Sequence, residues 1–230
     1  MSIAAIVVAA GQGKRMGAEI NKVLLPLAGK PVLAYCLETL NRSERVDRIV
    51  VVTRREDAQI VETLIGQYGI AKAGGEVVPG GAERFDSVLA GLNVLADNPP
   101  DSVLIQDAAR PFLTEPMIRD TLNALAESPG AVAGVPCKDT VKQVDDTRAV
   151  IATPDRSSLW IIQTPQTFRF GAILNAYRGY RPPPYPTDDA ALLEYRGERV
   201  TMIMASYANM KITTPEDLPI AEAMLCRRTE

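Results

Sequence analysis

The sequence of 230 residues contains no histidine. A Ser-His-Asp triad, a Cys-His pair and a histidine-ligated metal are therefore excluded. Any catalysis has to use Lys, Arg, Asp, Glu, Ser, Thr or Tyr. This set of residues favours electrostatic stabilisation of phosphate groups over proton shuttling by imidazole.

Cysteine is scarce as well, with Cys36, Cys137 and Cys226 far apart and in no C-x-x-C pair. This spacing argues against a zinc ribbon or a thioredoxin-type site and favours free thiols in a reducing cytosol. The first apolar run, IAAIVVAA, has no basic residue before it, and no stretch approaches the roughly 20 apolar residues of a membrane span. We therefore expect a cytoplasmic protein without a membrane partner.

Charge of one sign does not dominate, because the formal net charge is -3. A general nucleic-acid binder normally has a basic domain, so we expect no nucleic-acid partner. Local basic clusters still allow small ligands that carry phosphate.

Short β-branched runs alternate with helical patterns along the chain. The runs at residues 3–8, 47–53, 77–78 and 102–106 are typical of buried strands. Helical spacing follows at residues 33–40, 58–65 and 85–92. This alternation predicts one α/β domain over residues 1–230, with a Rossmann-like, mostly parallel central sheet and helices on both faces.

Residues 137–160 break this regularity, because they are polar and lack helical periodicity. They predict a protruding β-arm that returns to the sheet near Ile161, although a loop folded onto its own sheet is the alternative. Further on, residues 187–196 predict a helix, and Thr214 followed by Pro215 predicts the N-cap and first position of a final helix.

The strongest local signal is the loop AAGQGKRM at residues 9–16, directly after the first strand. Closely spaced glycines let backbone N–H groups approach phosphate oxygens. A Walker A loop needs Ser or Thr after Gly13-Lys14, and a dinucleotide loop needs glycine where Met16 stands. The basic residues Lys14, Arg15 and Lys22 suit a triphosphate better, but a tight turn without a ligand remains the alternative.

Further motifs make this loop part of a wider pattern. In order they are NKVLLPL (21–27), GKPVL (29–33), GGAERFDSV (80–88), DAARP (107–111), DTVK (139–142), DR (155–156), QTPQTF (163–168), TDDA (187–190) and NMKIT (209–213). Together they resemble the sugar-nucleotide-type nucleotidyltransferases over almost the whole chain. Within that superfamily the chain most resembles the 2-C-methyl-D-erythritol 4-phosphate cytidylyltransferases.

The resemblance implies an enzyme of non-mevalonate isoprenoid biosynthesis that transfers CMP from CTP to 2-C-methyl-D-erythritol 4-phosphate and releases pyrophosphate. It also implies Mg²⁺ or another divalent cation and a homodimer. The alternatives are another polyol-phosphate cytidylyltransferase, such as one using ribitol 5-phosphate, or an inactive nucleotide-binding homologue. The double alanine before Gly11 and the DAARP segment resemble the isoprenoid branch more closely. A dinucleotide-dependent oxidoreductase is disfavoured by the misplaced Gly17.

By the same resemblance, Arg15 and Lys22 are catalytic and Asp107 holds the metal. Solvated surface charges are the alternative for the two cations, and an N-cap or a pair with Arg110 is the alternative for Asp107. Ser87 could instead be an ordinary residue at a helix N-terminus. The implied nucleotide-binding residues are Ala9, Ala10, Gly11, Gly13, Gly81, Ala82, Ser87, Asp107 and Ala108.

For the polyol phosphate, charged groups match a phosphomonoester and threonines match hydroxyls. The implied residues are Arg110, Thr140, Arg156, Thr164, Thr187 and Lys211, of which Thr140 and Arg156 lie on the arm that crosses to a partner subunit. Three positions depart from relatives: Gln106 where many have histidine, Ala82 where some have aspartate, and Ala208 where an acid would supply a second metal ligand.

Overall fold

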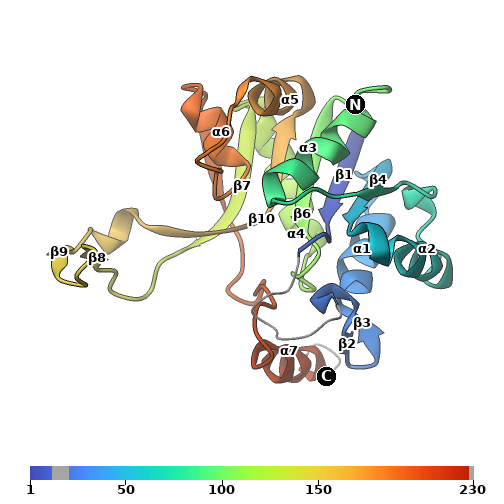
Figure 1. Cartoon of the computed structure of the whole chain (residues 1–230), viewed down its shortest axis with the longest axis horizontal. Coiled ribbons are helices and arrows are strands. Elements are labelled where there is room, and N and C mark those ends of the chain that lie inside the picture. The colour runs from blue at the N-terminus through green and yellow to red at the C-terminus, as the bar shows by residue number, and fades with distance from the viewer. Residues whose placement is uncertain (12–20, 228–230) are drawn as a thin grey trace.

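A seven-stranded sheet forms the centre of the protein (Figure 1). The structure, a computed structural model, describes residues 1–11 and 21–227. In spatial order the strands are β11 (Val200–Met204), β7 (Gly130–Pro136), β10 (Trp160–Arg169), β6 (Ser102–Asp107), β1 (Ile3–Val8), β4 (Arg48–Thr53) and β5 (Val77–Pro79). Only β10 runs antiparallel to its neighbours in this sheet. The predicted Rossmann-like, mostly parallel sheet is confirmed.

Helices cover both faces of the sheet. Successive side chains of a strand point to opposite faces, so each central strand contributes to two cores. Ile3, Ala5 and Val7 of β1 pack in one core, and Ala4 and Ile6 pack in the other. The first core includes residues of α1 (Val32–Arg42), α2 (Ala58–Gln67) and α4 (Glu115–Asn123). The second includes residues of α3 (Arg84–Leu95), α5 (Phe170–Gly179) and α6 (Ala190–Tyr195). A strand buried on both faces has to be apolar throughout, as the β1 sequence is.

The carboxyl ends of the parallel strands meet at one edge of the sheet. Beyond β1, the Ala9 N–H donates to the Val52 carbonyl at 2.7 Å, and beyond β6 the Ala108 N–H donates to the Val8 carbonyl at 3.1 Å. Because β10 is reversed, its first half begins at this same edge. Open α/β sheets bind ligands at this edge, so the topology already indicates where a site should lie.

The last helix begins later than the sequence predicts. The prediction of Thr214 as its N-cap is wrong, because α7 spans Asp217–Cys226. The Asp217 carboxylate accepts hydrogen bonds from the backbone N–H groups of Thr213 (2.7 Å) and Thr214 (2.9 Å), and this closes a turn ahead of the helix. In the same way, α6 begins at Ala190 rather than near Thr187, because Asp188 accepts from the Ala191 N–H at 3.1 Å.

The segment between β7 and β10 leaves the body of the protein (Figure 1). It carries a small hairpin of β8 (Gln143–Val144) and β9 (Val150–Ala152). Val144, Val150 and Ile151 are exposed on it. Among the described residues no helix combines the length and the apolar character needed to cross a membrane.

Removing a core side chain tests this packing. Leu37 on α1 is 0% exposed, whereas Ile60 on α2 is 55% exposed. We expect Leu37→Ala to lower the free energy of unfolding by about 2–5 kcal/mol, because it leaves a cavity in the first core. Ile60→Ala is the matched control and should stay within about 0.5 kcal/mol of the wild type in urea unfolding. A cost of less than about 1 kcal/mol for Leu37→Ala would contradict the described core.

Candidate active site

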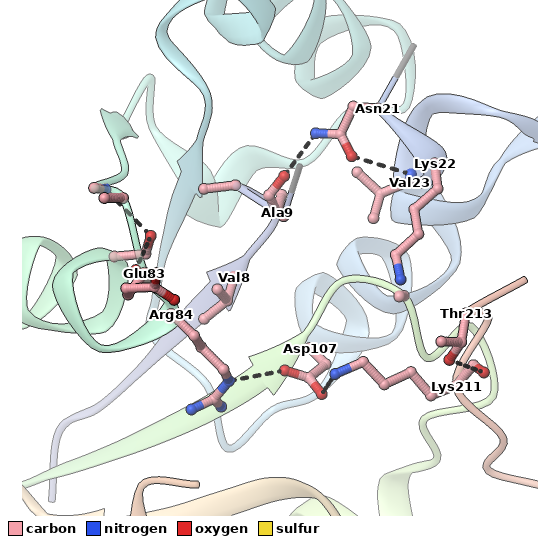
Figure 2. Close-up of a pocket in the computed structure, with 16 residues that line it drawn as sticks. Val8, Ala9, Asn21, Lys22, Val23, Glu83, Arg84, Asp107, Lys211 and Thr213 are labelled. Carbon is pink, nitrogen blue, oxygen red and sulfur yellow. Dashed lines mark hydrogen bonds and ion pairs between the residues drawn. The ribbon is translucent and has the colours of Figure 1, made fainter. Parts of the chain in front are cut away.

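Two cavities open at the carboxyl edge of the sheet and meet at three charged side chains. The first has a volume of about 370 Å³ and the second about 580 Å³. Arg84, Asp107 and Lys211 line both of them. Figure 2 shows Arg84 and Lys211 on either side of the Asp107 carboxylate in the first cavity.

Backbone segments form much of the first cavity. Ala9, Ala10 and Gly11 follow β1, and Gly81 and Ala82 follow β5. Such short side chains leave backbone N–H groups accessible to a phosphate or a base.

Gly80, directly after β5, allows two of these segments to approach each other. A Cβ atom there would lie 2.5 Å from the Ala10 Cβ and 2.7 Å from the Ser87 Oγ, so only glycine fits without a shift. Ser87 stabilises the same loop, because its Oγ accepts from the Gly81 N–H at 3.2 Å and donates to the Glu83 carbonyl at 3.1 Å. Ser87 is therefore both a residue of the first turn of α3 and a support of the cavity wall.

Asn21 places Lys22 on the opposite wall. Asn21 is 1% exposed, and its Nδ2 donates to the Ala9 carbonyl at 2.7 Å and to the Asp57 Oδ2 at 2.9 Å. Asp57 is held in turn by the guanidinium of Arg54. The start of the loop after β1 and its end at Asn21 are thereby tied together, and in Figure 2 the Lys22 side chain points into the cavity. Sequence reasoning missed Asn21 and Asp57, although Asn21 precedes Lys22 in a recognised motif.

Asp107, the last residue of β6, is the centre of the charged cluster. Its Oδ2 accepts from the Lys211 Nζ at 2.7 Å and its Oδ1 accepts from the Arg84 Nε at 3.3 Å. Arg110 lies further away, with its Nε 3.8 Å from Oδ2. Burial alone would raise the pKa of Asp107, but the charges of Arg84, Lys211 and Arg110 outweigh it and hold that pKa well below its usual range. The carboxylate is therefore ionised at any working pH.

This carboxylate also bears on the expected metal. Mg²⁺ prefers one or two carboxylates together with phosphate oxygens and water. Of the described residues that line the first cavity, only Asp107 and Glu83 carry carboxylates, and the described part of the chain contains no cluster of three or more metal-ligating side chains. The donor set fits a cation that substrate phosphates would mainly hold, to which the buried, ionised Asp107 would contribute one carboxylate.

The second cavity gathers most of the residues expected to bind the acceptor. Arg110, Thr164, Thr187 and Lys211 all line it. Thr164 is positioned by the antiparallel β10, since its Oγ1 accepts from the Asp107 N–H at 3.0 Å. Thr140 and Arg156 lie outside both cavities, between β7 and β10.

The predicted nucleotide-binding and catalytic residues divide into three groups. Those that line the first cavity are Ala9, Ala10, Gly11, Lys22, Gly81, Ala82, Ser87 and Asp107. Ala108 is fully buried and does not line it, whereas its neighbour Ala109 does. Gly13 and the expected catalytic Arg15 lie outside the described residues.

Comparison with known proteins assigns the chain to a family. The model of the family 2-C-methyl-D-erythritol 4-phosphate cytidylyltransferase (IspD) matches residues 3–227. The chain belongs to this cytidylyltransferase family. A relative of that name from Syntrophotalea carbinolica is 44% identical over 227 residues, covering 98% of this chain and 97% of the relative. Another from Geotalea uraniireducens is 44% identical over 232 residues, covering 98% and 97%.

Solved structures of this cytidylyltransferase family share the fold. The 4-diphosphocytidyl-2C-methyl-D-erythritol synthase of Anaerococcus prevotii superposes with a TM-score of 0.84 at 35% identity, covering 97% of this chain and 96% of that chain. The family member from Francisella tularensis gives a TM-score of 0.76 at 29% identity, covering 97% and 99%.

The three departures have distinct surroundings in this cytidylyltransferase. Gln106 is fully buried, and its Nε2 donates to the Asp107 carbonyl at 3.2 Å, so its amide supports the DAARP turn. Ala82 lines the first cavity with a methyl group. Ala208 precedes Asn209, whose Nδ2 donates to the Thr164 carbonyl at 2.9 Å. At positions 82 and 208 the side chain is a methyl group, so the polar groups at these positions are those of the backbone.

The Asn21 support predicts a pH-dependent stability. Burial alone would raise the pKa of Asp57, but its hydrogen bonds with Arg54 and Asn21 lower it below its usual value. A carboxyl whose pKa is lower in the folded state stabilises the fold above its unfolded pKa of about 3.9, and this contribution is lost as the pH falls.

We therefore expect Asp57→Asn to cost about 1–3 kcal/mol at pH 7 and much less at pH 3, measured by urea unfolding at both pH values. Asp146, exposed on the arm, offers the matched control Asp146→Asn, which should show no such difference. An equal cost at both pH values would contradict the role of the ionised carboxylate.

Proposed function

We propose that this chain transfers the cytidylyl group of CTP to 2-C-methyl-D-erythritol 4-phosphate and releases pyrophosphate, as a step of non-mevalonate isoprenoid biosynthesis. The product is 4-diphosphocytidyl-2-C-methyl-D-erythritol. The reaction is expected in the cytosol, as the sequence predicts. One observation carries the proposal: two cavities of different lining meet at Arg84, Asp107 and Lys211.

The lining of each cavity suits one substrate. Glycine and alanine backbone after β1 and β5 suits the triphosphate and the base of CTP. Arg110, Thr164 and Thr187 in the second cavity suit the phosphate and hydroxyl groups of a polyol phosphate. The acceptor phosphate would then approach the α-phosphorus of CTP where the cavities join.

At this junction, a phosphate oxygen of the acceptor forms the new bond to the α-phosphorus. The bond from the α-phosphorus to the bridging oxygen breaks, and its electron pair leaves with pyrophosphate. Positioning and fixed positive charge supply most of the catalysis of such transfers. We assign the fixed charges to Lys22 in the first cavity and Lys211 at the junction, and to Arg15 by resemblance to the family.

A divalent cation, most simply Mg²⁺, completes the proposed site. When bound, it would neutralise charge on the CTP phosphates. Asp107 would hold it from the protein side, and Lys211 and Arg84 would keep that carboxylate ionised and oriented.

We also propose that the protein is a homodimer in which residues 137–160 of one subunit reach the acceptor cavity of the other. The arm extends from the body (Figure 1) and exposes Val144, Val150 and Ile151. Exposed apolar side chains on a projecting hairpin favour contact with a second chain. Thr140 and Arg156 would contribute to the site only in such a dimer.

Pyrophosphate release with a panel of substrates tests the reaction. Turnover should need CTP rather than ATP, GTP or UTP, and methylerythritol phosphate should be used faster than ribitol 5-phosphate. Lys22→Ala should lower turnover by roughly 10²–10³-fold, because it removes fixed charge from the transition state. CTP should still bind to this variant in calorimetry. Faster use of ribitol 5-phosphate, or binding of CTP without any turnover in the wild type, would overturn the proposal.

Mixing two inactive variants tests the arm. If Arg156 acts in trans, each site takes Lys22 from one subunit and Arg156 from the other. A mixture of Lys22→Ala and Arg156→Ala should therefore regain roughly a quarter of the wild-type sites, because half of the dimers are mixed and each has one intact site. Lys22→Ala mixed with Lys211→Ala is the matched control, since both residues belong to one body and no site is restored. No rescue in the first mixture would refute action across the dimer.

A further inference from the structure

Arg84, the first residue of α3, contacts two carboxylates that belong to different parts of the protein. Its Nη1 and Nη2 donate to Oδ1 and Oδ2 of Asp189, each at 2.7 Å. Its Nε donates to the Asp107 Oδ1 at 3.3 Å. Both planar edges of the guanidinium are thus used, one towards a structural carboxylate and one towards the reaction centre.

Asp189 is a rigid anchor for this contact, because it is fully buried at the start of α6. The Tyr177 hydroxyl of α5 donates to its Oδ1. The backbone N–H groups of Asp189 and Ala190 both donate to the Gln166 Oε1 of β10 at 3.1 Å. Two elements, α5 and β10, therefore fix the anchor, and through it they fix Arg84.

Arg84 also lies at a position that separates the two cavities, since it lines both. Asp107 has two oxygens, and each is bound from a different side: Oδ1 by Arg84 and Oδ2 by Lys211. Lys211 and the more distant Arg110 both contact Oδ2, whereas Arg84 holds Oδ1, so loss of Arg84 would leave Oδ1 without that contact and loosen the orientation that Lys211 follows. The second contact is what defines a single orientation.

We propose that Arg84, locked by the buried Asp189, is a positioning residue of the transfer reaction: it orients Asp107 and so directs Lys211 towards the acceptor phosphate. The inference rests on the proposed function and adds residues that the expected site did not include. Asp189 is likewise a positioning residue: it lies further from the reacting groups and acts by holding Arg84.

A double variant separates positioning from simple stability. Arg84→Met alone leaves the Asp189 charge buried and unpaired, so it should lower the melting temperature strongly. Combining Arg84→Met with Asp189→Asn removes both charges, and the melting temperature should return close to that of the wild type. We expect the kcat/KM for the acceptor to stay roughly 100-fold low in this folded double variant, because Asp107 has lost its second contact.

Calorimetric binding of CTP should be retained in the double variant, because Lys22 and the glycine loops are untouched. Recovery of both the melting temperature and the acceptor kcat/KM would overturn the inference and reduce the pair to a structural one. If the double variant does not fold, Arg84→Lys decides. It keeps the charge but loses the paired hydrogen bonds, and an acceptor kcat/KM equal to that of the wild type would overturn the inference.

The matched control is a bidentate pair at the opposite end of the sheet. The Nε and Nη2 of Arg48 donate to Glu76 at 2.7 and 2.6 Å, at the start of β4. Arg48→Met combined with Glu76→Gln should leave the acceptor kcat/KM unchanged. Failure of the underlying reaction is distinguishable, because the wild type itself would then form no product from CTP and the acceptor.

Discussion

The ion pairing of the buried Asp107 carboxylate is the interaction on which the rest of the site depends. The carboxylate lies at the end of a fully buried strand, where an unpaired charge would be costly, and it is stable there because Lys211, Arg84 and Arg110 surround it. These cations come from three separate parts of the chain, so pairing this one charge draws together α3, the turn after β6 and the loop before α7. Of this cluster, Arg84, Asp107 and Lys211 line both cavities.

The sheet topology explains why this meeting point exists. Parallel strands end at one edge, and the loops after β1, β5 and β6 therefore surround a common space. The reversed strand β10 brings Thr164 to this edge from the other direction and opens the second cavity beside the first. A wholly parallel arrangement would have placed the start of that strand at the opposite end of the sheet. A site for two substrates thus follows from a single reversed strand.

Much of the fold and part of the site could be predicted from the sequence. The apolar runs of β1, β4 and β6 and the glycine-rich loop after β1 are local patterns, and they indicated the parallel sheet and a phosphate-binding edge. The start of α7 was mispredicted because the Asp217 side chain accepts from the backbone N–H groups of Thr213 and Thr214 and so closes a turn ahead of the helix. Asn21, Asp57 and Asp189 were missed because buried polar residues look like ordinary loop residues until their partners are known. The pairing of Arg84 with Asp189 spans 105 positions, and no local pattern encodes it.

By itself, the sequence determined the chemistry open to this protein. The absence of histidine excludes imidazole chemistry and favours electrostatic stabilisation of phosphates, and the ordered motifs indicate cytidylyl transfer. Only the tertiary structure decided which charges face each other, because hydrogen bonds and ion pairs depend on distances that the order of residues does not contain. It also separated Ala109, which lines the cavity, from the buried Ala108, and it revealed that Arg84 rather than Arg110 makes the shorter contact with Asp107. Residue types limit what a site can do, whereas packing decides which of them act together.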